Sequence, residues 1–282
     1  MLGTTGTDSK LRALGTVLIH IFLVMVILYI LMPLGWTFIS SIKSIEEIHS
    51  FPQTFLPKKT VFQNYAELWL KEGADKATYN SIIIALATTV VVTIGSTLAG
   101  YGFSRYHFKF DNLVFAGILG LRLIPPVTML IPLFRIFQAL RLLDTRIAII
   151  ISHIYLNLPI MIWIMRNFFV NIPKEIDEVA RVDGCTKFGA FRKVIIPLAL
   201  PGVATVSVLT FLFSWREFLF AFTISTQNAV TAPVAAQLWI GDVLVWWNFL
   251  SASGIIAAAP ALIFVLFFQR YITSGLTRGA IK

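Results

Sequence analysis

Six long apolar tracts limit how this chain can fold. They cover roughly residues 14–39, 80–103, 112–134, 147–166, 194–222 and 252–272. Each approaches or exceeds the length of about 20 mostly apolar residues that a helix needs to cross a lipid bilayer. Because 57% of the 282 residues are hydrophobic and only 13% are charged, a water-soluble globule and a disordered chain are excluded. The sequence predicts an all-α, polytopic protein with six transmembrane helices in a lipid bilayer.

Basic residues between the tracts predict the orientation of the chain. With the N-terminus inside, thirteen fall on the inner side: Lys10, Arg12, Arg105, Lys109, Arg166, Lys174, Arg181, Lys187, Arg192, Lys193, Arg270, Arg278 and Lys282. Eight fall on the outer side: Lys43, Lys58, Lys59, Lys71, Lys76, Arg135, Arg141 and Arg146. Since lysine and arginine accumulate in cytoplasmic loops, we expect a multi-pass protein of the plasma (inner) membrane with both termini cytoplasmic. The first tract is too long for a signal peptide core, so it is counted as a helix.

Several classes of function are disfavoured by the residues present. The net charge of +9 lies in short stretches between apolar tracts and forms no aromatic-interleaved stripe, so no nucleic-acid partner is expected. The single cysteine, Cys185, excludes an internal disulfide, and the histidines have no metal-ligand spacing. Ser152 and His153 are neighbours, but adjacent residues on a helix point in different directions. We expect no enzyme activity, no catalytic residue and no metal site, and the absence of a phosphate-binding glycine loop predicts that the chain itself binds no ATP.

Ionisable residues inside apolar tracts are a further feature of the sequence. Burying a charge in a membrane is costly, so such residues face a partner, a cavity or water. The candidates for a pathway or gate are Arg122, Pro125, Trp215, Arg216 and Glu217. For Arg122 the alternative is an arginine that reaches the membrane surface or pairs with another subunit. Small residues four apart, such as Ser96 and Gly100, predict close helix packing.

The inner loop between the fourth and fifth tracts is predicted to form two short helices. Its sequence from Asn171 to Gly202 is NIPKEIDEVARVDGCTKFGAFRKVIIPLALPG. An apolar stripe is formed by Ile172, Ile176, Val179 and Ala180, and Asp177 can pair with Arg181 at i, i+4. Gly184 supplies a helix stop and Thr186 an N-cap for the second helix. From these features alone, a short amphipathic helix lying on lipid is the ordinary interpretation.

The residue spacing in this loop resembles the signature of ABC importer permeases. Glu178, Ala180, Gly184 and Pro197 match the pattern Glu-Ala-Ala, three residues, Gly, nine residues, Ile, one residue, Leu-Pro. The departures, all apolar, are Val179, Val194 and Ile196. Residues 214–218, SWREF, are similar to the family's S-W-N-E-F, and residues 275–282, GLTRGAIK, to its closing G-L-T-x-G-A-x-K. The likeness runs from the second tract onward and indicates the carbohydrate-uptake branch, specifically the smaller permease of maltose-type transporters.

That resemblance implies a single transmembrane permease domain over residues 1–282, with a cytoplasmic coupling loop at about 167–193 and a cytoplasmic tail at about 273–282. It implies half of a sugar pathway, a second homologous permease, two cytoplasmic ATPase subunits and an extracytoplasmic sugar-binding protein. ATP and Mg would be bound by the ATPase, with no cofactor in this subunit. The implied ATPase-coupling residues are Glu178, Val179, Ala180, Asp183, Gly184 and Pro197, with tail contacts from Gly279 and Lys282.

Individual roles follow from the same resemblance. Glu178 is expected to pair with a basic residue of the ATPase, Ala180 to pack in its cleft, and Gly184 to form the sharp turn. Arg216 stands where relatives usually carry Asn, so no family role is carried over to it.

Two other classes of function stay open from sequence. A stand-alone secondary transporter or channel predicts more spans or an inverted repeat, with mid-membrane carboxylates, for which Glu217 is the one candidate. The third class is a structural membrane scaffold. The outer loop from Thr223 to Ser251 carries Trp239, Trp246 and Trp247, which are either interfacial anchors or, as in relatives, part of a loop that reaches the binding protein.

Overall fold

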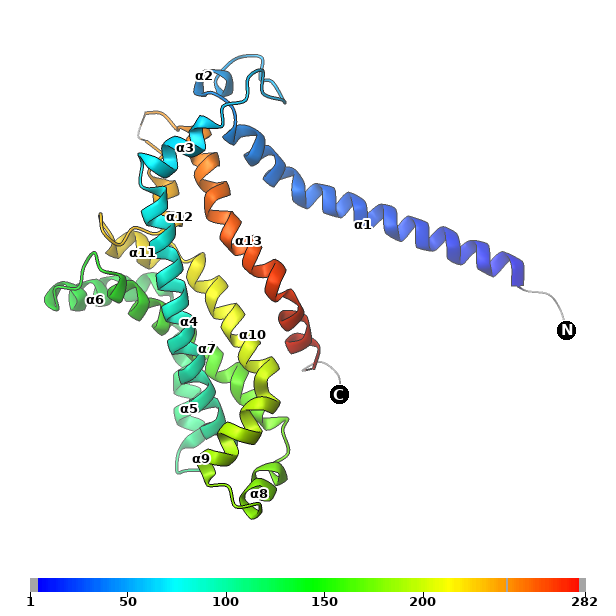
Figure 1. Ribbon diagram of the computed structural model, residues 1–282, viewed down its shortest axis with the longest axis vertical. Coiled ribbons are helices and arrows are strands. Elements are labelled where there is room, and N and C mark those ends of the chain that lie inside the picture. Colours follow the sequence, from blue (N-terminus) through cyan, green and yellow to red (C-terminus); the bar gives the residue numbers. More distant parts are fainter. Residues whose placement is uncertain (1–4, 242, 279–282) are drawn as a thin grey trace. The chain divides into compact units, whose positions relative to one another are not determined.

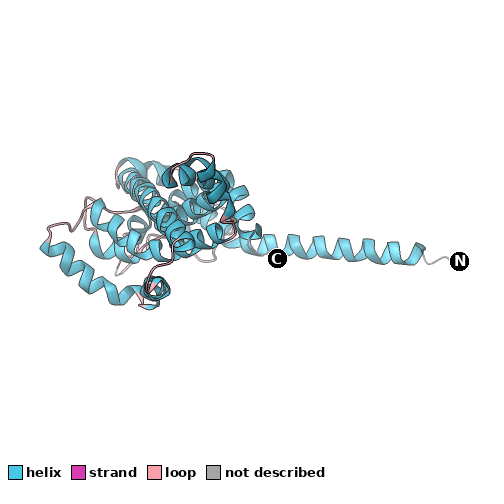
Figure 2. Cartoon of the chain, turned by 90° about the horizontal axis from the view of Figure 1, so that it is seen from below, coloured by secondary structure: helices cyan, strands magenta, loops and turns pink. Residues whose placement is uncertain are grey.

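The computed structural model describes the backbone of residues 5–241 and 243–278, and the side chains of residues 14–241 and 243–268. Among these residues every named element is a helix, and strand character is confined to one isolated bridge between Ile240 and Val245 (Figure 2). Five helices are long and apolar enough to cross a membrane: Leu14–Ser41, Ala74–Arg105, Arg146–Val170, Lys187–Trp215 and Trp247–Phe268. A bent helix pair makes a sixth if it is counted as one span. The predicted all-α membrane fold is confirmed.

The third apolar tract is not a straight helix. It is divided into α5 (Asp111–Gly120), the 3-10 turn η1 (Leu121–Leu123) and α6 (Pro126–Ala139). The two arms are bent by 96°. A residue before proline is pushed out of the helical region, and both Ile124 (ψ 120°) and Pro125 (ψ 131°) precede a proline. Two consecutive prolines therefore break this tract, where one proline inside a helix only kinks it.

The fifth apolar tract is also divided. Helix α10 (Ile196–Trp215) ends at Trp215, and after three intervening residues α11 (Leu219–Ile224) begins, followed by α12 (Ala232–Gln237). The Glu217 carboxylate accepts hydrogen bonds from the N–H groups of Phe220 (3.0 Å) and Ala221 (3.2 Å). These backbone donors have no partner within the new helix, so Glu217 stabilises its start.

The chain divides into two compact units. The first comprises Met1–Lys71 and Trp239–Ile255 and contains α1 (Thr5–Ser41), α2 (Ile45–Ile48), α3 (Gln63–Leu70) and the start of α13 (Trp247–Arg278). Within it the buried Asn64 amide donates to the carbonyls of Ser41 (2.8 Å) and Lys43 (3.0 Å). Asn248 donates in turn to the Asn64 side-chain oxygen (3.3 Å). Asn64 thus joins α3 to the end of α1 and to α13.

The second unit comprises Glu72–Leu238 and Ile256–Lys282. Its helices α4 (Ala74–Arg105), α7 (Arg146–Val170) and α10 lie side by side, and α8 (Glu175–Val182) and α9 (Lys187–Ala190) lie at one end of them (Figure 1). A Cβ added at Gly100 would lie 2.7 Å from Met165 Cβ and 2.8 Å from the Arg166 nitrogen. The close approach of α4 and α7 therefore requires glycine at position 100, as the small-residue spacing predicts.

Candidate functional site

The short helices α8 and α9 follow one another in the chain (Figure 1). The turn that joins them contains Gly184. Gly184 has φ +88°, a left-handed conformation that glycine adopts without strain. The Cys185 N–H donates to the Ala180 carbonyl across the turn (3.0 Å), which closes a Schellman-type helix end. The Thr186 hydroxyl accepts from the Gly189 N–H (3.0 Å) and so caps α9. The turn and the cap expected from sequence are confirmed.

Asp177 attaches α8 to the end of α4. Its carboxylate accepts hydrogen bonds from Arg105 Nε (2.7 Å) and from the Tyr101 hydroxyl (2.6 Å). The other guanidinium nitrogens of Arg105 donate to the carbonyls of Phe169 (3.0 Å) and Ile172 (2.9 Å), at the end of α7. We call Tyr101, Arg105 and Asp177 the Arg105 clamp, because one side chain joins α4, α7 and α8.

The clamp is largely shielded from solvent, since the side chains of Arg105 and Asp177 are only 6% and 14% exposed. The predicted pairing of Asp177 with Arg181 is wrong. Its partner Arg105 lies 72 residues away in the sequence. The buried ion pair makes α8 a fixed extension of two long helices.

Helix α8 turns one side to its own chain and the other outward. Ile176 packs against the apolar core of the second unit, and Ala180 is only 6% exposed. Glu178 and Asp183 are exposed, while Val179 and Val182 are 59% and 86% exposed. Val179, a member of the predicted apolar stripe, is therefore exposed, whereas Ala180 of the same stripe is buried. The packing of Ala180 in a partner's cleft stays a prediction; within this chain Ala180 is almost buried, and the exposed valines of α8 are Val179 and Val182.

The second half of the loop continues directly into a long helix. After α9 the chain forms a π-helical turn, η2 (Phe191–Ile195), and enters α10 without interruption. Pro197 lies in the first turn of α10, where proline is well tolerated, and its side chain is exposed. Helix α9 is thus continuous with a helix long enough to span the membrane, Lys187–Trp215.

A cavity of about 400 Å³ brings together Arg122, Arg216 and Glu217. The Glu217 carboxylate is bonded to His153 Nε2 (3.0 Å), and His153 Nδ1 is bonded to the Ser214 hydroxyl (2.7 Å). The cavity therefore combines a fixed carboxylate with two exposed arginines. Among the residues whose side chains are described, no group of three or more His, Cys, Asp or Glu is placed to hold a metal ion.

Other residues expected at the gate have different roles. Trp215 is 5% exposed and donates from Nε1 to the Ala257 carbonyl (3.0 Å), so it packs α10 against α13. Pro125 precedes α6 at the helix break and does not line the cavity, whereas Pro126 does. The tail residues Gly279 and Lys282 lie outside the described part of the chain. Helix α13 continues through residues 273–278, where the sequence predicts the start of a tail.

Three further site residues have only weak signals in the sequence. Arg105 counts there only as an inner-side charge, yet Tyr101 and Arg105 share a helix face at i, i+4. In the sequence, His153 stands out only as the neighbour of Ser152. The signal for its pairing is that a histidine lies in one apolar tract and the Glu217 carboxylate in another. Each of these groups needs a polar partner inside a membrane.

Comparison with known proteins identifies the family. Residues 91–278 match the family described as "Binding-protein-dependent transport system inner membrane component". The chain belongs to this family. It is 34% identical over 253 residues to the sulfoquinovosyl glycerol transport system permease protein SmoH of Agrobacterium fabrum, covering 89% of each chain. It is 35% identical over 261 residues to the trehalose transport system permease protein SugB of Mycobacterium tuberculosis, covering 92% of this chain and 94% of that protein.

Solved structures agree on the fold. A bacterial ABC transporter involved in the import of the acidic polysaccharide alginate is matched with a TM-score of 0.75 at 22% identity, over 96% of this chain and 99% of that chain. The MetNI methionine ABC transporter is matched with a TM-score of 0.59 at 16% identity, over 74% of this chain and 98% of that chain. The resemblance to ABC importer permeases of the carbohydrate-uptake branch is confirmed. The chain is an inner-membrane permease subunit of a binding-protein-dependent ABC importer, not an enzyme.

Proposed function

We propose that this chain forms half of the pathway for a sugar and couples its passage to a cytoplasmic ATPase through α8 and α9. Relatives named for sulfoquinovosyl glycerol and trehalose transport support the substrate class. So does the trehalose/maltose permease MalG of Thermococcus litoralis, which is 30% identical over 275 residues. The assembly then contains a second homologous permease, two ATPase subunits that bind ATP and Mg, and an extracytoplasmic sugar-binding protein.

The coupling role rests mainly on one observation: one side of α8 is exposed, and the other is fixed to its own bundle. Glu178 presents a carboxylate to a basic residue of the ATPase, beside the exposed apolar side chains of Val179 and Val182. The Arg105 clamp joins α8 to α4 and to the end of α7. When the ATPase moves the docked loop, the ends of these helices move with it. The driving free energy is the tighter binding of ATP to one of the two states.

The cavity that holds Arg122, Arg216 and Glu217 is the proposed stretch of pathway in this chain. Sugar hydroxyls both donate and accept hydrogen bonds, so they can bond to guanidinium groups and to a carboxylate. His153 keeps the carboxylate in place at the cavity wall, bonded at 3.0 Å. This arrangement supports a polar passage.

We propose that both termini and the α8–α9 loop face the cytoplasm, as the thirteen-to-eight excess of basic residues favours. The chain supplies a direct test, because its single cysteine, Cys185, lies at the turn between α8 and α9. A membrane-impermeant maleimide should label Cys185 in inside-out vesicles and not in right-side-out vesicles. Cys185→Ser is the control for specificity. Labelling confined to right-side-out vesicles would overturn this orientation.

Uptake by the purified assembly tests the function itself. The chain should co-purify with an ATP-hydrolysing partner and, with its binding protein, drive sugar uptake into proteoliposomes. Glu178→Arg and Gly184→Trp should leave the protein inserted in the membrane but uncouple ATP hydrolysis from uptake. Glu72→Arg, an exposed carboxylate in the turn before α4, is the matched control and should transport normally. Unchanged transport in both loop variants would refute the coupling role.

A further inference from the structure

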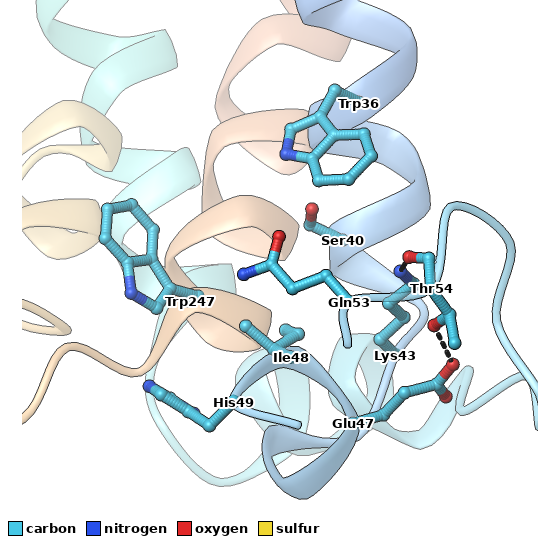
Figure 3. A pocket seen from close by; sticks show the side chains of 9 residues that line it. All are labelled: Trp36, Ser40, Lys43, Glu47, Ile48, His49, Gln53, Thr54 and Trp247. Atoms are coloured by element: carbon cyan, nitrogen blue, oxygen red, sulfur yellow. Dashed lines mark hydrogen bonds between the residues drawn. The ribbon is translucent and has the colours of Figure 1, made fainter. Parts of the chain in front are cut away.

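The first unit contains a cavity of about 390 Å³ with two tryptophans at its sides. Trp36 comes from the end of α1 and Trp247 from the start of α13, and the Gln53 side chain extends between them (Figure 3). Both indoles are partly open, at 43% and 48% exposure. Pockets for small molecules typically range from about 300 to 1,000 Å³ and combine aromatic walls with a few polar groups. This cavity has the size and the walls for a small ligand.

Neutral polar groups are available inside the cavity. Neither the Ser40 hydroxyl nor the Gln53 amide hydrogen-bonds to another side chain or backbone group in the described part of the chain. Figure 3 shows both groups directed into the space between the tryptophans. An amide and a hydroxyl together offer donors and acceptors without charge. They suit a ligand that carries many hydroxyl groups.

The charged residues of the lining are already engaged. The Lys43 ammonium donates to the Thr54 carbonyl and lies 5.4 Å from the centre of the Trp36 ring. The Glu47 carboxylate accepts from the Thr54 hydroxyl (2.7 Å) and from the Lys58 N–H (2.8 Å). One cation and one anion, each with its own partners, give the lining no selectivity for a charged ligand.

We infer that this cavity is a saccharide-binding site, in which the C–H face of a sugar ring packs on an indole and its hydroxyls bond to Gln53 and Ser40. Aromatic side chains combine a large apolar surface with defined stacking geometry, which suits the flat apolar face of a pyranose. The site shares no lining residue with the cavity of Arg122, Arg216 and Glu217. The choice of trehalose and maltose as ligands rests on the proposed function. In the orientation proposed above, the site faces the extracytoplasmic side, where it would hold sugar before entry.

A lipid headgroup is the competing occupant, because tryptophans often anchor helices at the membrane interface. A phosphate group would be favoured by an uncommitted cation in the cavity. The engagement of Lys43 with Thr54 and Trp36 argues against that role. The neutral amide and hydroxyl favour the saccharide.

Photolabelling of the assembled transporter tests the site. The complex is placed in phosphatidylcholine nanodiscs without ATP and irradiated with diazirine derivatives of trehalose and maltose, and the labelled peptides are mapped. Label should appear in the peptides that carry residues 36–54 and 247, and excess unmodified sugar should remove it. Trp36→Ala, and separately Gln53→Ala on the exposed loop, should each reduce this label at least fivefold. Trp69→Ala is the matched control, since Trp69 is 44% exposed in the same unit but does not line the cavity.

Three results would overturn the inference: no sugar-protected label in these peptides, an equal loss in Trp69→Ala, or label displaced by phosphatidylglycerol but not by sugar. The last result would assign the cavity to a lipid headgroup. Uptake measured on the same preparation separates this inference from the proposed function. Sugar uptake without labelling of the cavity refutes only the saccharide site, whereas failure to take up any sugar of a broad panel refutes the proposed function.

Discussion

Removing the negative charge of Asp177 should release α8 from the bundle. Asp177→Asn keeps the shape of the side chain, but leaves a guanidinium that is only 6% exposed without its counter-ion. Breaking a buried ion pair costs about 3–5 kcal/mol. Arg105 keeps two carbonyl partners, at 3.0 and 2.9 Å, and asparagine still accepts a hydrogen bond. We therefore expect the substitution to weaken the docking of α8 by about 2–3 kcal/mol, which is about a 30- to 150-fold shift in the equilibrium between docked and released α8.

Hydrogen exchange of the α8 amides measures this shift, and proteoliposome uptake measures its consequence. In Asp177→Asn the α8 amides should exchange faster by that factor, and uptake should fall while ATP hydrolysis continues. The double variant Asp177→Asn with Arg105→Gln should weaken the docking of α8 by at least 1 kcal/mol less than the sum of the two single substitutions. The reason is that residues in one buried pair are coupled. Glu175→Gln, an exposed carboxylate on the same helix, is the control.

Two outcomes would refute this reasoning. In the first, α8 of Asp177→Asn exchanges at the rate seen in Glu175→Gln. In the second, the two changes at Asp177 and Arg105 add within about 0.5 kcal/mol, as independent sites do. Either result would mean that the Arg105 clamp does not hold α8.

Three further predictions concern stability. Gly100→Ala should overpack the contact between α4 and α7 and lower the thermal midpoint, at a cost of about 1–3 kcal/mol. Gly102→Ala should not, because an added Cβ there meets nothing within 4 Å. Equal midpoints for the two variants would contradict this. Gly184→Ala should destabilise the α8–α9 turn by about 1–3 kcal/mol through its φ of +88°, seen as faster exchange of the Cys185 amide. Partial burial raises the pKa of Asp144, but four backbone N–H groups of residues 226–229 outweigh it and hold the pKa well below its usual range. Protection of these four amides from hydrogen exchange, corrected for intrinsic exchange, should therefore be complete above the unfolded pKa of about 3.9 and fall at lower pH. Unchanged protection in Asp144→Ala would contradict this.

Local signals in the sequence predict the helices and the turn well. Long apolar tracts predict spanning helices, because a bilayer leaves the backbone few other ways to satisfy its hydrogen bonds. The turn at Gly184 and the cap at Thr186 depend on residues within a few positions of each other, so residue type alone indicates them. The signature from Glu178 to Pro197 indicates the proposed coupling loop for the same reason.

Contacts between distant segments are what the sequence could not predict. Helical periodicity pairs Asp177 with Arg181, four residues away, while the structure pairs it with Arg105 from another helix. His153 is likewise explained only by Ser214 and Glu217, which lie more than 60 residues further along the chain. Such pairings depend on how helices pack, which no single-helix pattern contains.

The break between the two arms of the third tract bears on how this segment is inserted. The arms, Asp111–Leu123 and Pro126–Ala139, are each about 20 Å long at 1.5 Å per residue, too short to cross a hydrocarbon core of about 30 Å alone. An interrupted backbone inside a membrane normally leaves N–H groups without partners. Pro125 and Pro126 have no N–H group, so the interruption leaves no backbone donor without a hydrogen-bond partner at these two positions. Replacing this pair with two alanines would restore a continuous helical pattern and favour one helix, kinked only at Pro132, that crosses the membrane in one pass.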